Sequence, residues 1–178
     1  EELKKLDTEI KVLFVGGHVS ALPIETLTEE NSIDFIALNE GVYAISNLLK
    51  VENLNDEKYL TRVKGIGFRN NENKIIINES EIIVPKKLLD LDLPGVAWDL
   101  LPPLKEYRTA GWHSWSNNSE KQPFAALYTS LGCPYTCSFC MINIINRTDQ
   151  SENISSQDSN VFRWWKPEFI IKQFDYFA

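Results

Sequence analysis

The sequence predicts an α/β protein in which buried parallel strands alternate with helices. Two short apolar runs, residues 10–15 and 33–38, are each interrupted by only one charged residue, Lys11 or Asp34, and have the nearly continuous hydrophobicity that is typical of strands covered on both faces. A helical pattern follows each run, so the order is strand, helix, strand, helix. We therefore expect the later part of a doubly wound, Rossmann-like layer, because two strands are too few to form such a sheet alone.

The boundaries of these first elements are marked by glycine, proline and helical spacing. The first run stops at Gly16-Gly17, and Pro23 then stands where the first turn of a helix tolerates proline. Residues 1–6 are typical of the end of a helix. The second run leads into a helix over 40–51, which has a stripe of four apolar residues, Val42, Ile45, Leu48 and Leu49.

The rest of the chain changes character twice. Residues 64–84 predict a β-hairpin with its turn at 70–73. Four prolines punctuate residues 85–107, which we interpret as an extended linker at a domain boundary. Residues 124–131 predict another buried strand, and residues 162–177 predict a helix beyond a polar segment.

Composition excludes several classes of protein. The 178 residues include 18 Lys and Arg against 25 Asp and Glu, for a net charge of −7, and 43% are hydrophobic. A packed core is therefore expected, whereas a nucleic-acid surface is not, because phosphate binding requires clustered positive charge. No apolar run approaches the roughly 18 residues that span a bilayer, and the N-terminus lacks the apolar centre of a signal peptide. We expect a soluble cytoplasmic protein.

All three cysteines of the chain, Cys133, Cys137 and Cys140, lie within eight residues, immediately after the strand predicted over 124–131. Their C-x3-C-x2-C spacing suits a cubane iron–sulfur cluster, in which three thiolates leave one iron open to a further ligand. A structural zinc site with His113 or His18 as fourth ligand is one alternative, and inert free thiols are another. The cluster is favoured because zinc sites usually pair their ligands in two knuckles, and no second cysteine pair is present.

At these residues the sequence resembles the radical S-adenosylmethionine (radical SAM) enzymes, whose defining motif is this loop after the first strand of a partial TIM barrel. Similarity extends to Ser130–Gly132, Pro134 and Phe139. The resemblance implies that the three cysteines ligate a 4Fe-4S cluster and that S-adenosylmethionine chelates the open iron. It further implies that Phe139 lies against the adenine and that reductive cleavage yields a 5′-deoxyadenosyl radical.

Upstream, residues 12–23 and 33–41 resemble the later part of the cobalamin-binding domain that precedes many such enzymes. The family typically has Gly-Glu-Gly-Glu where this chain has Asn-Glu-Gly-Val at 39–42. An ordinary tight turn is the alternative for the glycine pair, and His18 is not assigned to cobalt because no Asp-x-His-x-x-Gly pattern surrounds it. By the resemblance, four residues would line the cobalamin edge of the sheet: Gly16, Gly17, Glu40 and Gly41.

The resemblance also sets the expected domains. Residues 1–63 would be a partial cobalamin-binding domain, 64–123 the hairpin and connector, and 124–178 the first strand–helix unit of the radical SAM barrel. Because both domains would be incomplete, we expect a fragment truncated at both ends, inactive alone.

The parent would be a cobalamin-dependent radical SAM enzyme acting on a small molecule, with methyl transfer to an unactivated carbon as one outcome. A flavodoxin or ferredoxin would supply electrons. The alternatives are an iron–sulfur or zinc-stabilised binding module without radical chemistry, and a methylthiotransferase. The methylthiotransferase ranks lower, because such an enzyme would carry further cysteines in its N-terminal domain and none precedes Cys133.

Overall fold

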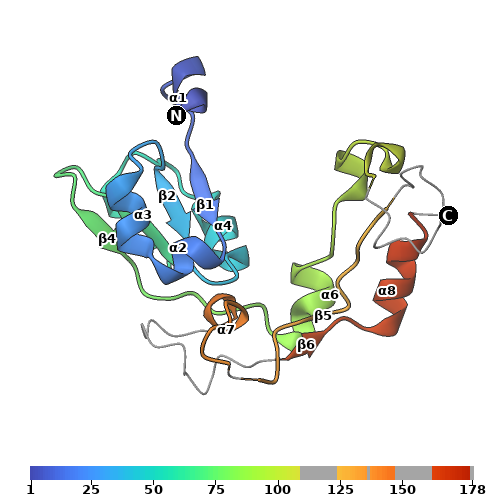
Figure 1. Cartoon of the computed structure of the whole chain (residues 1–178). Coiled ribbons are helices and arrows are strands. Elements are labelled where there is room, and N and C mark those ends of the chain that lie inside the picture. The colour runs from blue at the N-terminus through green and yellow to red at the C-terminus, as the bar shows by residue number, and fades with distance from the viewer. Residues whose placement is uncertain (109–123, 136, 147–161, 177–178) are drawn as a thin grey trace. The chain divides into compact units, whose positions relative to one another are not determined.

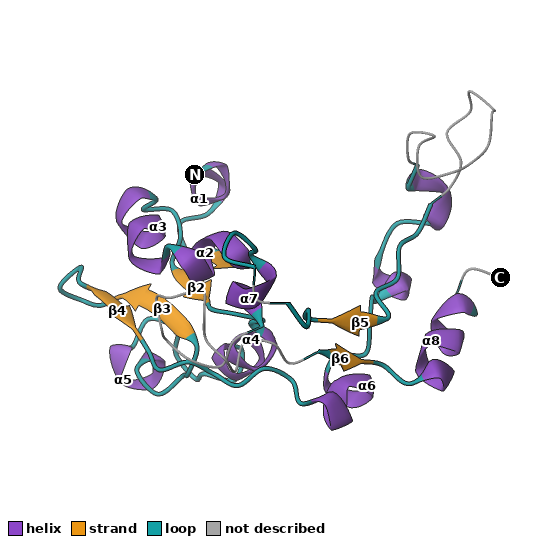
Figure 2. Ribbon diagram, turned by 60° about the horizontal axis from the view of Figure 1, so that its bottom comes forward, coloured by secondary structure: helices purple, strands orange, loops and turns teal. Residues whose placement is uncertain are grey.

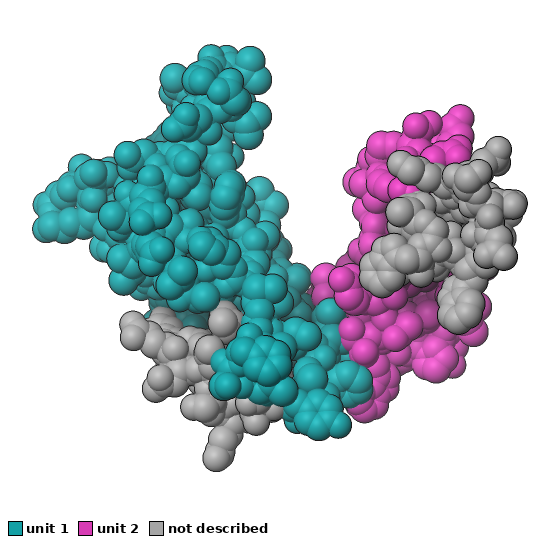
Figure 3. Space-filling view, viewed as in Figure 1, with its two compact units in different colours: residues 1–85, 131–163 teal, residues 86–130, 164–178 magenta. Residues whose placement is uncertain are grey.

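The structure, a computed structural model, describes residues 1–108, 124–135, 137–146 and 162–176. The chain divides into two compact units, which Figure 3 colours separately. The first comprises Glu1–Pro85 and Leu131–Arg163, and the second comprises Lys86–Ser130 and Trp164–Ala178. The expected domain limits at residues 63 and 123 stay predictions.

A four-stranded sheet forms the centre of the first unit, in the order β1-β2-β3-β4. β1 and β2 are parallel, whereas the β2–β3 and β3–β4 pairs are antiparallel. The fold is therefore α/β with a mixed sheet, compatible with a Rossmann-like fold. The hairpin is confirmed, and its first strand continues the same sheet. The strands are β1 (Leu13–Val15), β2 (Phe35–Ala37), β3 (Ile66–Arg69) and β4 (Ile75–Ile77).

Helices lie on both faces of this sheet (Figures 1 and 2). β2 is fully buried as expected, whereas Phe14 and Val15 of β1 are about half exposed, so the expectation that residues 10–15 form a strand buried on both faces is wrong. Successive residues of β2 alternate between two cores, because side chains of a strand point to opposite faces in turn. Phe35 and Ala37 join the core that α4 and α5 complete, whereas Ile36 joins the core that α2 and α3 complete. These helices are α2 (Gly17–Ala21), α3 (Pro23–Glu29), α4 (Val42–Leu48) and α5 (Glu57–Leu60).

The predicted helices of this unit are present, although the helix expected over 40–51 is shorter and spans Val42–Leu48. Pro23 occupies the first turn of α3, where its missing N–H would have no partner inside the helix. α4 begins after Gly41, whose φ of 75° lies in the left-handed region that glycine adopts without strain. A short helix, α1, spans Glu2–Leu6, as expected for the first residues.

The segment 85–107, which we expected to be extended, is only partly so. This segment contains short helical turns, and the side chain of Leu89 is fully buried. The prolines limit the length of each turn without preventing it, since proline is tolerated at helix starts. The turns are η1 (Lys86–Leu88), α6 (Leu89–Asp92), η2 (Trp98–Leu100) and η3 (Leu104–Glu106).

Two further predictions need correction. The strand predicted over 124–131 is only β5, Ser130–Leu131, which pairs with the two-residue β6, Arg163–Trp164. A strand extends only as far as its backbone groups find partners, and the described partner is short. The helix predicted from residue 162 begins later, as α8 (Pro167–Phe174), because β6 occupies the preceding positions. In the parts of the chain that are described, no helix has the length and apolar character needed to cross a membrane.

Candidate functional site

The carboxyl ends of β1 and β2 form one edge of the sheet, because the two strands are parallel. Gly16 follows β1, and Asn39 lies in the loop after β2. The Ser20 hydroxyl of α2 links these loops: it donates a hydrogen bond to the Gly16 carbonyl oxygen at 2.7 Å and accepts one from the Asn39 N–H at 2.8 Å. In open α/β sheets, ligands bind beyond this edge.

The three glycines predicted to line this edge differ in their surroundings. Gly16 has a φ of 122°, and no neighbouring atom lies within 4 Å of the position of a Cβ. At Gly41 a Cβ would lie 2.6 Å from Cγ2 of Val15. At Gly17 it would overlap the Met141 side chain. Gly16 is therefore the one of these three with open space beside it.

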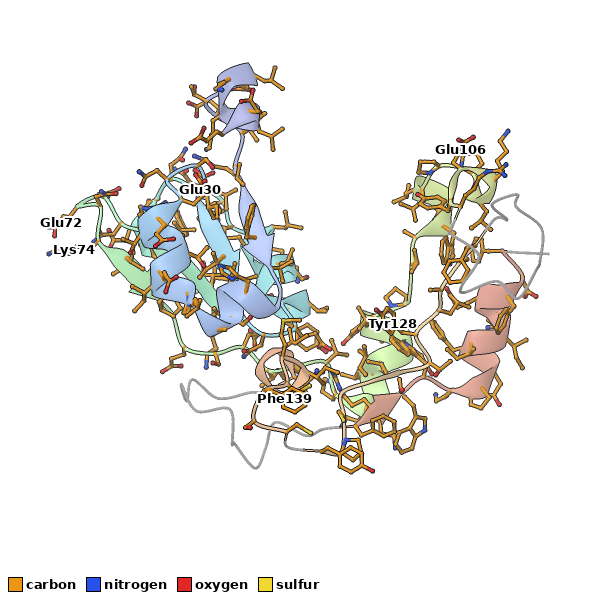
Figure 4. The ribbon with its side chains drawn as sticks, viewed as in Figure 1. Glu30, Glu72, Lys74, Glu106, Tyr128 and Phe139 are labelled. Carbon is orange, nitrogen blue, oxygen red and sulfur yellow. The ribbon has the colours of Figure 1, made fainter. Side chains whose placement is uncertain are left out.

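The cysteine loop follows β5. Cys133 and Cys140 are half-buried, Cys137 is exposed, and all three are free thiols. The Cys140 N–H donates a hydrogen bond to the Cys137 carbonyl oxygen at 3.1 Å, which closes a turn between these two cysteines. Phe139 projects from this turn with 89% of its surface exposed, next to the start of α7 (Ile142–Ile145; Figure 4).

Among the described residues, no group of three or more His, Cys, Asp or Glu side chains converges to hold a metal ion. The structure thus places the three thiols on one loop without bringing them into a ligand cage. Their chemistry nevertheless fits an iron–sulfur cluster, since all three are unpaired thiols and none is fully buried. As for the alternative zinc ligands, His18 is exposed on α2, and His113 lies outside the described residues.

The far end of the cysteine loop contacts the carboxyl edge of the sheet. Met141, directly after Cys140, lies against Gly17 at the start of α2, and α7 packs beside α2 (Figure 1). Gly17 and the cysteine loop were predicted as parts of two different sites. The structure brings them together within the first unit.

The predicted site residue Glu40 belongs to a buried ion pair that sequence reasoning missed. Its Oε1 accepts a hydrogen bond from Nη2 of Arg163 at 2.6 Å, and its Oε2 accepts one from Nη1 at 3.2 Å. The Arg163 side chain is 0% exposed and the Glu40 side chain 12%. The one signal in the sequence is a charged residue inside the apolar run Val161–Trp165.

Two further groups complete this cluster. The Val84 N–H donates to Glu40 Oε2 at 2.7 Å, and the Val84 carbonyl oxygen accepts from Arg163 Nη1 at 2.6 Å. Nη2 of Arg163 also donates to Oδ1 of Asn146 at 2.9 Å. Asn146 is the C-cap of α7, so the guanidinium joins the helix after the cysteine loop to the loop after β2.

Comparison with known proteins shows a similarity to a methyltransferase. No family model matches the chain. It is 29% identical over 139 residues to an uncharacterized methyltransferase of the archaeon Pyrococcus horikoshii, an alignment that covers 77% of this chain and 26% of that protein. The chain thus spans about a quarter of the length of this relative, and the similarity is to a methyltransferase.

Proposed function

We propose that this chain is part of a radical SAM enzyme that transfers a methyl group to a small-molecule substrate and that also carries a cobalamin-binding layer. The observation that carries the proposal is the C-x3-C-x2-C set of free thiols in the loop after β5. The name of the Pyrococcus relative supports the transferase part. The iron–sulfur part is supported by the residue types and spacing of the loop.

The residues of the cysteine loop would have two roles, ligation of the cluster and contact with the adenine. Cys133, Cys137 and Cys140 would hold three irons of a 4Fe-4S cluster, and the exposed Phe139 would offer its ring to the adenine of S-adenosylmethionine. A bound cluster would supply, through its open iron, the electron that breaks the bond between the sulfonium and the 5′ carbon. An exposed Cys137 leaves the loop accessible to an electron donor such as a flavodoxin or ferredoxin.

Anaerobic reconstitution tests the iron–sulfur part. We expect the chain, incubated with iron and sulfide and then reduced, to give a 4Fe-4S EPR signal that changes when S-adenosylmethionine is added. Alanine at any of Cys133, Cys137 or Cys140 should abolish the signal, whereas Ser138→Ala, an exposed position of the same loop, should retain it. A chain that takes up zinc and no iron would instead be a zinc-stabilised binding module.

The cobalamin part of the proposal rests on the carboxyl edge of β1 and β2, where Gly16 leaves open space. Equilibrium dialysis of the chain against cobalamin tests this part separately. Binding that Gly16→Leu weakens supports it, because that side chain would fill the open space. Absence of binding removes cobalamin from the proposal and leaves the iron–sulfur part to its own test.

A further inference from the structure

The buried ion pair belongs to a hydrogen-bonded cluster that joins segments far apart in the sequence. Its members are Arg163, Glu40, Val84 and Asn146. Arg163 lies 123 residues from Glu40 and 17 from Asn146 along the chain. The guanidinium therefore connects the loop after β2 with the C-terminal end of α7. We call this cluster the Arg163 clasp.

α7 has few other attachments among the described residues. It is four residues long, and Ile142 remains 39% exposed. Met141 lies against Gly17 and yet is 54% exposed, so that contact covers only part of the side chain. A single helical turn is not stable alone, because its nucleation is unfavourable. Besides its packing beside α2, the described contacts that hold α7 are thus the Met141 contact at its start and the clasp at its end.

We propose that Arg163 and Glu40 are positioning residues that hold the third cysteine of the loop beside the carboxyl edge of the sheet. Arg163 fixes Asn146, Asn146 ends α7, and α7 begins two residues after Cys140. The geometric inference stands on these contacts, and its meaning for cofactor binding rests on the proposed function. Cys137, the first residue of the turn, is exposed, and its side chain has no described contact with α7 or the clasp.

Thiol alkylation in the metal-free, reduced chain tests the proposal without any iron. After brief exposure to iodoacetamide the chain is denatured and cut with chymotrypsin, which cleaves after Tyr135 and Phe139 and so separates the three cysteines into different peptides. The quantity measured is the ratio of the alkylation rate of Cys140 to that of Cys137. Cys137 serves as the internal reference, since it is exposed at the outset.

Asn146→Ala is the principal variant, because it removes one acceptor of the guanidinium and leaves the Glu40–Arg163 pair intact. We expect the ratio to rise about tenfold, as local opening of α7 becomes easier. Arg163→Met should raise it at least as much, and Arg163→Lys should restore part of the protection by keeping a charge beside Glu40. Glu79→Gln, which breaks an exposed pair with Lys64, is the matched control and should leave the ratio unchanged.

An unchanged ratio in Asn146→Ala, in protein whose circular dichroism matches the wild type, would overturn the proposal. An equal rise for Cys137 and Cys140 would also overturn it, since that result describes general loosening and not the release of one helix. If Arg163→Met does not fold, the Asn146→Ala result decides alone.

Reconstitution of the same variants then separates the two proposals. If the wild-type chain binds no iron while Asn146→Ala still raises the alkylation ratio, the proposed function fails and the positioning role stands. If the wild type forms the cluster, we expect Asn146→Ala to broaden its EPR signal, whereas Glu79→Gln should not.

Discussion

Removal of the Glu40 carboxylate should destabilise the first unit far more than an exposed charge would. Arg163 is 0% exposed, so Glu40→Ala leaves a buried cation with only the Val84 and Asn146 oxygens as described acceptors. Breaking one partner of a buried pair costs about 3–5 kcal/mol, because an uncompensated charge stays in a medium of low polarity. We expect a loss of this size in the free energy of unfolding.

The companion variant Arg163→Met removes the buried cation itself, so its cost comes from the groups that lose a hydrogen-bond donor. Glu40 is 12% exposed and keeps the hydrogen bond from the Val84 N–H, so its charge remains partly solvated. The oxygens of Val84 and Asn146 lose a donor, at about 1–3 kcal/mol each if they stay unsatisfied. In the double variant no charge remains buried and unpaired, so its cost should fall short of the sum of the single costs by about 2–3 kcal/mol.

Urea denaturation followed by far-UV circular dichroism measures the loss in free energy of unfolding for each single variant and for the double variant. The transitions should agree at several wavelengths. The Lys64–Glu79 pair supplies a matched control cycle, since it spans 3.1 Å and its side chains are 57% and 80% exposed. Its coupling should be about 0–1 kcal/mol. Additive costs for Glu40→Ala and Arg163→Met would refute the reasoning, because the pair would then contribute no mutual stabilisation.

Three further outcomes are expected. Gly17→Ala should lower the free energy of unfolding by about 1 kcal/mol, since its Cβ displaces Met141, and it should cost nothing in a Met141→Ala background. Gly67→Val should cost about 1–3 kcal/mol or more, because even a Cβ there would lie 2.7 Å from Ile77 and 2.8 Å from Ile36. The Ser32 hydroxyl and N–H both donate to the Glu30 carboxylate and lower its pKa, so Ser32→Ala should raise that pKa toward its ordinary value in an NMR titration. The pKa of Glu30 is lower in the folded chain than in the unfolded chain. The contribution of Glu30 to stability is therefore present above the unfolded pKa and is lost as the pH falls through the folded pKa. Ser32→Ala should reduce this pH dependence.

Each of these outcomes has a result that would contradict it. A cost for Gly17→Ala that persists without Met141 would show that the glycine is needed for another reason. An unaltered melting temperature for Gly67→Val would mean that the neighbouring isoleucines move aside freely. An unchanged pKa of Glu30 in Ser32→Ala would assign the shift to a cause other than the hydroxyl.

The sequence could predict those elements whose signal lies within a short window. The positions of β1 and β2 follow from nearly continuous apolar runs, and the start of α3 follows from Pro23, because these signals act locally. The antiparallel pairing of β2 with β3 could not be predicted, because partners such as Phe35 and Phe68 are set by tertiary contacts between distant segments. The short helical turns within 85–107 could not be predicted either, because the prolines indicate an extended segment and the burial of Leu89 is a tertiary contact.

The candidate site also contains some residues that a local sequence pattern predicts and others that only tertiary contacts identify. The three cysteines were found because metal-ligand spacing is a local pattern. Arg163 was missed because a charge in an apolar run acquires meaning only from its partner, and that partner lies 123 residues away. The contact between Met141 and Gly17 was missed for the same reason, because nothing in the sequence around either residue indicates that the two are neighbours.

These contacts also restrict what Glu40 can do at the predicted cobalamin edge. Its carboxylate accepts three hydrogen bonds, from Nη1 and Nη2 of Arg163 and from the Val84 N–H, out of about four acceptor directions. A ligand that took this carboxylate as its main contact would therefore have to displace Arg163 and leave the guanidinium buried without its counter-charge, at a cost of about 3–5 kcal/mol. A ligand that contacted the backbone at Gly16 would meet open space and break none of these bonds. Binding at this edge is consequently expected to depend on Gly16 directly and on Glu40 through the position of α7.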